Sequence, residues 1–448
     1  MTHVAVSEWG KIPVSEAPGE AAGFSRAQAN ALFQAARAHP LGGADGTSIL
    51  TDHHRYLRAA QMVGVLAADD CSLEVLPKID PAASDESQPT VRARLIQMLD
   101  VALGLGLGSG VQASMAVQGG SLLDILIRTF ADRLLAAVQH GLPREYRTEE
   151  DDRNTLRGRL NVGRQFTVLA ARPNQLACRY DELSSDIALV QVMKACVLFV
   201  SRFARAGETR RRLDELRFLL ADTTTVHPSA LPWADIRINR SNRTWAELVT
   251  LAQMLMRRDW QDTRHDPGRQ QGISLLFPMN DLFETYVATL SRRVARRHGF
   301  TMEAQGGGLF CVRDDDAGGR QLFQTRPDII IRDDEGRARL IIDTKWKRIS
   351  SQLEDKRQGV SQADVYQMMA YGELYDCADL VLLYPRQAVA RTRRRLPIKP
   401  SGVRALQVAD IDVTADLHAI EQELAELIER ASSNRAEFHH RNAAGFGS

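Results

Sequence analysis

The sequence predicts a mixed α/β protein, α+β overall, built from two or three domains. Short runs rich in isoleucine and valine, bounded by turn-forming residues, predict strands towards both ends of the chain. Amphipathic segments longer than ten residues predict helices, and most of these lie in the middle of the chain. A length of 448 residues with 44% hydrophobic residues is enough for more than one sizeable core.

Residues 1–120 are expected to form an N-terminal domain with short strands. Ser25 is a candidate cap for a helix over residues 26–38, and residues 62–66 and 73–79 are expected to be strands. The glycine-rich stretch 103–110 is not followed by Gly-Lys-Ser/Thr, which argues against a phosphate-binding loop. We expect a flexible loop there, because so many glycines disfavour a helix.

Residues 121–265 are expected to form an all-helical linker domain. Its helices are predicted over residues 122–138, 187–205, 210–220 and 245–256. The polar segment 262–271 marks the boundary to a third domain, residues 266–431, and residues 432–448 are expected to be a disordered tail.

The third domain contains the most informative pattern, a predicted β-hairpin. Residues 327–331 and 340–346 are isoleucine-rich runs separated by turn-forming residues around Glu335. This places Asp328 opposite position 342 or 343. Because side chains alternate along a strand, Asp343 and Lys345 project from the same face. Two carboxylates and one ammonium group are therefore expected to converge.

Paired carboxylates at the ends of apolar strands repel each other unless a cation lies between them. Oxygen ligands suit Mg²⁺ or Mn²⁺, so Asp328 and Asp343 are candidate metal ligands and Lys345 a candidate catalytic residue that orients water or offsets phosphate charge. Lysine is scarce, with 7 Lys against 50 Arg. The alternative is an ordinary hairpin whose charges are solvated.

Two flanking helices carry further candidates. Glu284 lies among apolar residues of a helix that begins near Asn280, and it is either a surface carboxylate or a third metal ligand and catalytic residue. Gln367 lies on a helix over residues 361–371, and it either packs there or supports the catalytic strand or a phosphate.

Overall charge does not predict binding to nucleic acid, because the net charge is only +1. A local patch after the strand 380–384 is the candidate DNA-binding surface, made of Arg391, Arg393, Arg394 and Arg395. The five cysteines form no Cys-x-x-Cys pair, which argues against structural zinc. No leader and no apolar run of about 18 residues is recognisable, so we expect a cytoplasmic protein without a membrane span.

Four motifs in this order resemble a known family: Phe-Pro-Met-Asn-Asp-Leu-Phe-Glu-x-Tyr-Val from position 277, Arg-Pro-Asp-Ile from 326, Asp-Thr-Lys-Trp-Lys from 343 and Asp-Val-Tyr-Gln-Met-x-Ala-Tyr from 364. They are similar to the PD-(D/E)xK, restriction-endonuclease-like nuclease domain of the McrC family, the endonuclease subunits of McrBC 5-methylcytosine restriction systems. Segments 73–79, 156–160 and 178–186 are similar to the amino-terminal half of that family.

The resemblance implies that Asp328 and Asp343 bind the metal, that Lys345 is the catalytic lysine, and that Glu284 and Gln367 are accessory. It also implies a partner, a hexameric AAA+ GTPase of McrB type that reads methylated DNA, with the N-terminal part of the chain stimulating its GTP hydrolysis.

The leading hypothesis is a metal-dependent endonuclease subunit of a modification-dependent, type IV restriction complex. Two alternatives remain: a catalytically silent, nuclease-like activator of a motor NTPase, and a stand-alone repair nuclease. Cleavage and partner nucleotide turnover, measured separately, distinguish the three.

Overall fold

The computed structural model describes residues 2–15, 23–43, 46–68, 70–78, 87–106, 121–256, 273–315, 318–347, 360–386, 393–398 and 404–444. Their helices and strands confirm a mixed α/β fold. By internal contacts the chain divides into two compact units: Met1–Gly119 together with Arg269–Ser448, and Gly120–Gly268. Both ends of the chain therefore belong to one unit. None of the described helices is long and apolar enough to cross a membrane.

The N-terminal part of the first unit contains a four-stranded sheet in the order β1-β7-β6-β11. The strand β1 (Thr2–Ser7) runs parallel to β7 (Cys71–Leu76), and β6 (Met62–Ala68) runs antiparallel to β7. The edge strand β11 (Ile273–Pro278) comes from far along the chain and pairs with β6. This segment falls within the predicted third domain, residues 266–431, but it completes the N-terminal sheet.

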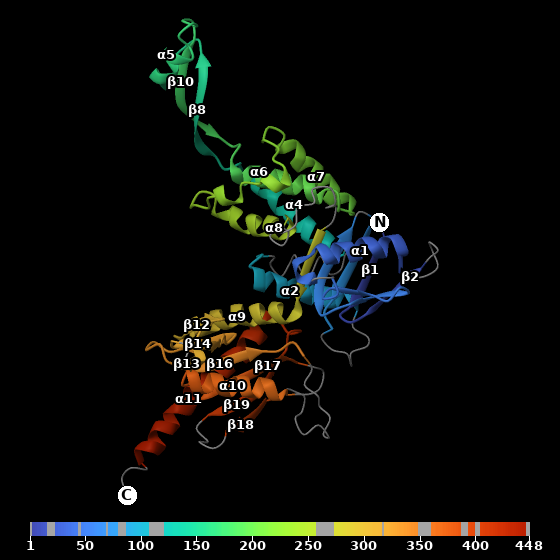
Figure 1. Cartoon of the computed structure of the whole chain (residues 1–448), viewed down its shortest axis with the longest axis vertical. Coiled ribbons are helices and arrows are strands. Elements are labelled where there is room, and N and C mark those ends of the chain that lie inside the picture. The colour runs from blue at the N-terminus through green and yellow to red at the C-terminus, as the bar shows by residue number, and fades with distance from the viewer. Residues whose placement is uncertain are drawn as a thin grey trace. The chain divides into compact units, whose positions relative to one another are not determined.

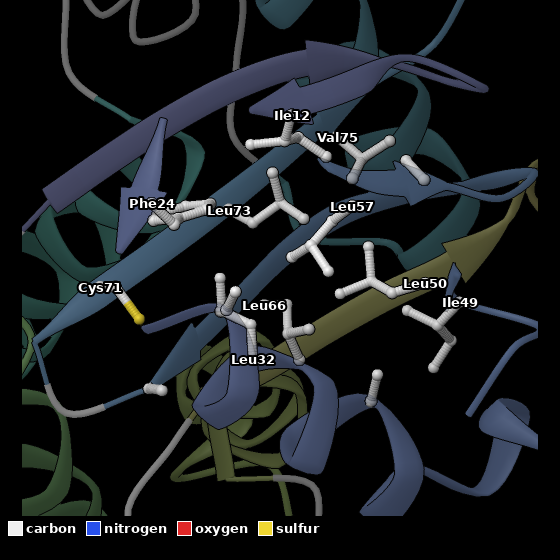
Figure 2. Packing of buried hydrophobic residues seen from close by; sticks show 14 of the residues in the cluster. Ile12, Phe24, Leu32, Ile49, Leu50, Leu57, Leu66, Cys71, Leu73 and Val75 are labelled. Atoms are coloured by element: carbon white, nitrogen blue, oxygen red, sulfur yellow. The ribbon is translucent and has the colours of Figure 1, made fainter. Parts of the chain in front are cut away.

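A second sheet, in the order β3-β2-β5-β4, and the helix α1 (Arg26–Ala38) enclose a hydrophobic core with the first sheet. Leu32, Leu57 and Leu73 bring side chains from the helix and from both sheets into this core (Figure 2). Ser25 caps the helix as predicted, in a capping box with Gln28. The strands of the second sheet are β2 (Lys11–Ser15), β3 (Phe24–Ser25), β4 (Leu50–Asp52) and β5 (Tyr56–Ala59).

The predicted strands over 62–66 and 73–79 are confirmed as β6 and β7, the latter ending at Leu76. The helix α2 (Gln88–Leu103) follows and contacts α9 (Met279–Arg297). Part of the glycine-rich stretch, from position 107, lies outside the described residues, as does the predicted boundary segment 262–271.

The second unit contains the four predicted helices, α4 (Leu122–His140), α6 (Ala188–Val200), α7 (Gly207–Leu219) and α8 (Ala246–Met256). The prediction of an all-helical region is wrong, however. A three-stranded antiparallel sheet in the order β8-β10-β9 and a short helix follow α4 and precede α6 in the chain, and in Figure 1 they extend away from the helices. These elements are β8 (Glu145–Arg153), β9 (Arg159–Leu160), α5 (Val162–Thr167) and β10 (Leu176–Ser184). The strands escaped prediction because β8 is polar on both faces and so lacks the alternation that marks a half-buried strand.

The C-terminal part of the first unit is built on a six-stranded sheet in the order β12-β15-β16-β17-β19-β18. The central strands β16, β17 and β19 are parallel, and the pairs β12-β15, β15-β16 and β18-β19 are antiparallel. The strands are β12 (Thr301–Ala304), β15 (Ile329–Arg332), β16 (Ala338–Thr344), β17 (Asp379–Pro385), β18 (Arg393–Pro397) and β19 (Ala405–Ile411).

One face of this sheet packs on α10 (Gln362–Leu374), with Met368 and Tyr371 against Ile341 and Leu382. The helices α9 and α11 (Leu417–Ala444) contact each other and β16. A separate hairpin of β13 (Phe310–Asp314) and β14 (Arg320–Gln324) interrupts the chain between β12 and β15. Helices on both sides explain why β16 and β17 are almost wholly buried.

The C-terminal tail differs from the sequence-based expectation. Residues 432–448 were expected to be disordered, but α11 continues through Ala444. The physical reason is composition: positions 432–444 contain neither glycine nor proline, so nothing in the sequence terminates the helix before Gly445.

A substitution at Gly64 tests the pairing of β6 with β11, because Gly64 lies on β6 opposite β11. Its φ is +126°, and a Cβ atom there would lie 1.8 Å from the carbonyl oxygen of Leu275. Gly299 of the same unit also has a positive φ, +75°, but no atom lies within 4 Å of its added Cβ. We expect Gly64→Ala to lower the free energy of unfolding by roughly 1–3 kcal/mol more than Gly299→Ala, because only the former adds a clash to backbone strain. Urea unfolding measures both, and equal losses would contradict the pairing.

Candidate active site

The predicted hairpin is present and positions the two aspartates. In the β15-β16 pair, Ile329 lies opposite Ile342. Asp328 precedes the first of these residues and Asp343 follows the second, so the two carboxylates are cross-strand neighbours at one end of the pair. The prediction that Asp328 faces position 342 or 343 agrees with this register. The isoleucine runs form the strands, and the turn at Asp333–Gly336 closes them.

Asp328 is fixed in orientation by Thr344. Its Oδ2 atom accepts hydrogen bonds from the Thr344 backbone N–H (2.7 Å) and from the Thr344 hydroxyl (2.8 Å). Burial raises the pKa of Asp328 although these two hydrogen bonds lower it. One oxygen of the carboxylate is therefore tied to the next strand.

Asp343 is 1% exposed and forms an ion pair with Lys345, whose Nζ lies 2.6 Å from its Oδ2. The ammonium group of Lys345 is the charged partner of Oδ2, and Oδ1 has no hydrogen-bond partner among the described residues. Burial and, next, the charge of Asp328 raise the pKa of Asp343 to about 6. Burial lowers the pKa of Lys345, but the combined attraction of Asp343, Asp328 and Asp364 outweighs burial, and the pKa is raised overall. Lys345 is therefore a cation at neutral pH.

Asp328, Thr344 and Lys345 border a cavity of about 360 Å³ in the first unit, and the buried Asp343 adjoins it through its ion pair with Lys345. Glu284 of α9 lines it too, half-buried, with its Oε1 accepting a hydrogen bond from Gln305 (2.8 Å). Burial and then the charge of Asp328 raise the pKa of Glu284 to about 6. The structure thus brings together four of the five predicted catalytic residues. The lining residues are Gln61, Asn280, Glu284, Asp328, Thr344, Lys345, Trp346, Lys347 and Asp364.

Gln367 does not line the cavity. Its Nε2 donates to the Tyr371 hydroxyl (2.6 Å), which donates in turn to the backbone carbonyl of Arg326 (3.2 Å). Arg326 lies two positions before Asp328. The contact agrees with the expectation that Gln367 supports the catalytic strand, and the side chain acts there through a tyrosine.

Several lining residues were missed by the sequence analysis. Lys347 and Asp364 form an ion pair across the cavity. Lys347 carries a usable signal, since it continues the two-residue spacing of Asp343 and Lys345. Asp364 lies three positions before Gln367, on the same side of the helix. Gln61 carries no such signal, because it reaches the cavity only through tertiary packing.

The predicted arginine patch is not part of this cavity. Arg391 lies outside the described residues. Arg393 is paired with Glu426 (2.8 Å) and Arg395 with Asp379 (3.1 Å). Arg394 is exposed on the edge strand β18, in register with Asp343 but three strand spacings away, about 14 Å.

The donor atoms at the site suit a hard cation. Asp343 offers a buried oxygen, Oδ1, that has no hydrogen-bond partner among the described residues, and Asp328 lies beside it as a second carboxylate. Within the described ranges no three Asp, Glu, His or Cys side chains are clustered as a complete ligand set. Mg²⁺ commonly binds through one or two carboxylates, with waters and substrate phosphates completing its shell. The pair therefore fits Mg²⁺ or Mn²⁺, with Glu284 within electrostatic reach of both aspartates.

Comparison with known proteins gives a consistent result. A family model described as McrBC 5-methylcytosine restriction system component matches residues 57–385. The chain is similar in fold to a solved structure described as a half-complex from a tetradecameric assembly of Thermococcus gammatolerans McrB AAA+ hexamers with bound McrC. The sequence identity is 19% and the TM-score is 0.71, and the match covers 96% of this chain and 100% of that chain. The cryo-EM structure of the Thermococcus gammatolerans McrBC complex gives 22% identity and a TM-score of 0.54 over 65% of this chain and 88% of that chain. No curated protein matches the sequence.

The raised pKa values predict how pH and metal affect stability. Asp343 and Glu284 ionise near pH 6 when folded, against ordinary pKa values of 3.8 and 4.5, so the folded chain retains protons that the unfolded chain releases. Without metal, stability should therefore fall as the pH rises from about 4 through 6. Mg²⁺ at about ten times its Kd should restore roughly 1.4 kcal/mol at pH 7.5 and much less at pH 5, where protons compete.

Thermal unfolding in Mg²⁺ and in EDTA at the two pH values measures this effect. Asp343→Asn serves as the control, because it removes one charge and should abolish most of the metal response. Equal stabilisation of the wild type and this variant by Mg²⁺ would contradict the assigned ligands.

Proposed function

The chain belongs to the family of McrBC 5-methylcytosine restriction system components, as a subunit of McrC type, and from this premise we propose that it is a metal-dependent DNA endonuclease. The observation that carries the proposal is the arrangement of Asp328, Asp343 and Lys345 on two paired strands beside one cavity. We assign the six-stranded sheet with its flanking helices to the PD-(D/E)xK fold, since two acidic residues and a lysine at this spacing lie at one end of its β15-β16 pair.

In the proposed mechanism, Asp328 and Asp343 hold Mg²⁺ or Mn²⁺ with Glu284 as a third, accessory carboxylate. The metal, when bound, supplies stabilisation of the charge that develops on the phosphate and on the leaving oxygen. Thr344 keeps the Asp328 carboxylate oriented through its two hydrogen bonds. The side chains are thus preorganised before substrate arrives.

Lys345 acts as a cation in this scheme. Because its pKa is raised, its ammonium group keeps its protons at neutral pH and serves as a hydrogen-bond donor instead of a base. It can orient the attacking water or contact a phosphate oxygen when DNA enters the cavity. Lys347 lines the same cavity and adds a second positive charge opposite Asp364.

The proposed partner is an AAA+ GTPase ring of McrB type. The similar Thermococcus structure contains McrB AAA+ hexamers with bound McrC. By analogy, this chain would cut DNA, methylated in the family's systems, when assembled with such a ring, and would stimulate its GTP hydrolysis. The near-neutral net charge supports a role for the ring in bringing DNA to this chain, because the chain alone has no strong electrostatic field to attract DNA.

Replacing the central residues tests the proposal. Asp343→Ala and Lys345→Ala should each lower the rate of DNA cleavage by the assembled complex at least about 100-fold, because each removes a preorganised charge at the reacting phosphate. Folding, assembly and stimulation of the ring's GTP hydrolysis should be retained. Asp333→Ala is the matched control: this aspartate lies at the turn of the same hairpin, paired with Arg337 and Arg339, and outside the cavity.

The measurements are DNA cleavage and nucleotide turnover on the same samples. Unchanged cleavage by the Asp343 and Lys345 variants would refute the site. A wild-type chain that stimulates the ring but never cuts would instead be a silent activator, and cleavage without ring or nucleotide would indicate a stand-alone repair nuclease.

A double-mutant cycle tests the supporting role of Gln367. Gln367→Leu and Tyr371→Phe should each slow cleavage by about tenfold, and together by little more, because both break one chain of hydrogen bonds to the Arg326 carbonyl. Tyr366→Phe on the exposed side of the same helix is the control and should leave the rate unchanged. Full additivity of the two effects would contradict a shared role.

A further inference from the structure

Trp346, the residue after Lys345, is held at three points by the N-terminal part of the first unit and the start of α9. Its backbone N–H donates to the Asn280 side-chain oxygen, and its carbonyl accepts from the Gln61 side-chain amide, both at 3.2 Å. Its indole Nε1–H donates to the Glu8 carboxylate at 3.3 Å. The indole is buried and packs against Phe283, with ring centroids 5.4 Å apart.

Glu8 is an unusual partner for an indole, because its carboxylate is only 4% exposed. The same oxygen that accepts from Trp346 also accepts from the backbone N–H of Lys78 (2.9 Å), while the other oxygen has no hydrogen bond. Burial raises the pKa of Glu8, and the donors from Lys78 and Trp346 oppose this rise. Such a carboxylate lowers stability compared with an apolar residue, so its position needs another explanation.

The three hydrogen bonds that hold Trp346, here called the Trp346 clamp, lie at a position in the chain that supplies that explanation. The strand β16 ends at Thr344, and beyond it Lys345 keeps one backbone contact to the sheet, its N–H to the Leu383 carbonyl (2.9 Å). Beyond this contact, Trp346 makes the three hydrogen bonds described above, and the Lys347 side chain pairs with Asp364. Gln61, Asn280 and Trp346 also line the cavity that Lys345 borders. A displacement of about 1 Å at a catalytic group can cost about 100-fold in rate.

We propose that Glu8, Gln61 and Asn280 are positioning residues of the nuclease reaction, which fix Trp346 and thereby hold Lys345 beside Asp343. On this view the N-terminal sheet is a component of the catalytic centre, and not solely a surface for a partner. The inference rests on the proposed function, since it concerns the placement of the proposed catalytic lysine.

Variants of the two ends of the indole contact test the proposal in the full chain assembled with its ring. Trp346→Phe keeps an aromatic ring against Phe283 but removes the indole donor, and Glu8→Ala removes the acceptor. Each should slow single-turnover cleavage at saturating DNA by 10- to 100-fold while DNA affinity, measured with Ca²⁺ in place of Mg²⁺, changes less than twofold. Glu8→Gln, which keeps an oxygen acceptor, should recover most of the rate.

Glu74→Ala is the matched control. Glu74 is also a buried carboxylate of the β1-β7-β6-β11 sheet, but it pairs with Arg92 and His3 and does not contact Trp346. Its loss should destabilise the chain yet leave the cleavage rate of the folded protein unchanged. Equal slowing by Glu74→Ala and Glu8→Ala, compared at equal folded fraction, would reduce the effect to general destabilisation and overturn the proposal.

A readout without catalysis reports on the contact itself. In the ¹⁵N-indole spectrum of the full chain, the Trp346 signal is identified by its loss in Trp346→Phe. Glu8→Ala should shift this signal, and Glu74→Ala should not. A Trp346 signal that does not shift in Glu8→Ala would overturn the proposed contact between the indole and Glu8.

The outcomes also separate this inference from the function on which it rests. Wild-type cleavage with undiminished rates in Glu8→Ala and Trp346→Phe overturns the positioning role alone. A wild-type complex that fails to cut overturns the nuclease function, and a shifted indole signal then marks a purely structural contact.

Discussion

Two acidic side chains, Asp328 and Asp343, lie side by side at the ends of paired strands, and holding them there is the constraint on which the C-terminal part of the first unit depends. Their repulsion in a poorly solvated place is offset by Lys345 on one side and by the Thr344 hydrogen bonds on the other. The strands that carry them are buried isoleucine runs covered by helices. The apolar residues of the sheet thus fix the register of the paired strands, and the polar end of the β15-β16 pair carries the charged groups.

Segments from both ends of the chain in the first unit meet at this cavity. The strand β11 belongs to the N-terminal sheet, and the chain passes from its end directly into α9, which carries both Asn280 and Glu284 to the cavity. Gln61, at the start of β6, approaches from the same sheet. The walls of the cavity therefore come from segments more than 200 residues apart, which explains why the two ends of the chain form one compact unit.

Much of the site was predictable because its chemistry is local in sequence. Asp328 and Asp343 belong to one hairpin, and strand alternation places Lys345 with them without any knowledge of the rest of the fold. The same rule, applied one step further, would have included Lys347. Glu8 and Gln61 could not be predicted, because their contacts to Trp346 join positions 338 and 285 residues apart. For the fold, capping and amphipathic patterns located most helices, whereas the polar strand β8 carried no hydrophobic alternation and was missed.

Two buried carboxylates hold the end of β16: Asp343 pairs with Lys345, and Glu8 accepts a hydrogen bond from Trp346. Their surroundings assign them different tasks. Leaving a buried polar atom without a partner costs about 1–3 kcal/mol, so both positions lower stability in the metal-free chain. Glu8 receives two N–H donors on one oxygen, which suits a structural contact. One oxygen of Asp343 has no hydrogen-bond partner in the described part of the chain, the other pairs with the Lys345 ammonium group, and a second carboxylate lies beside them. Two N–H groups satisfy one oxygen of Glu8, and its other oxygen has no hydrogen bond among the described residues. Around Asp343, negative charge exceeds the positive charge of Lys345, because Asp328 and Glu284 add two more carboxylates. A cation is what such a group of side chains still requires, and this charge imbalance distinguishes the cavity from the other buried polar sites of the unit.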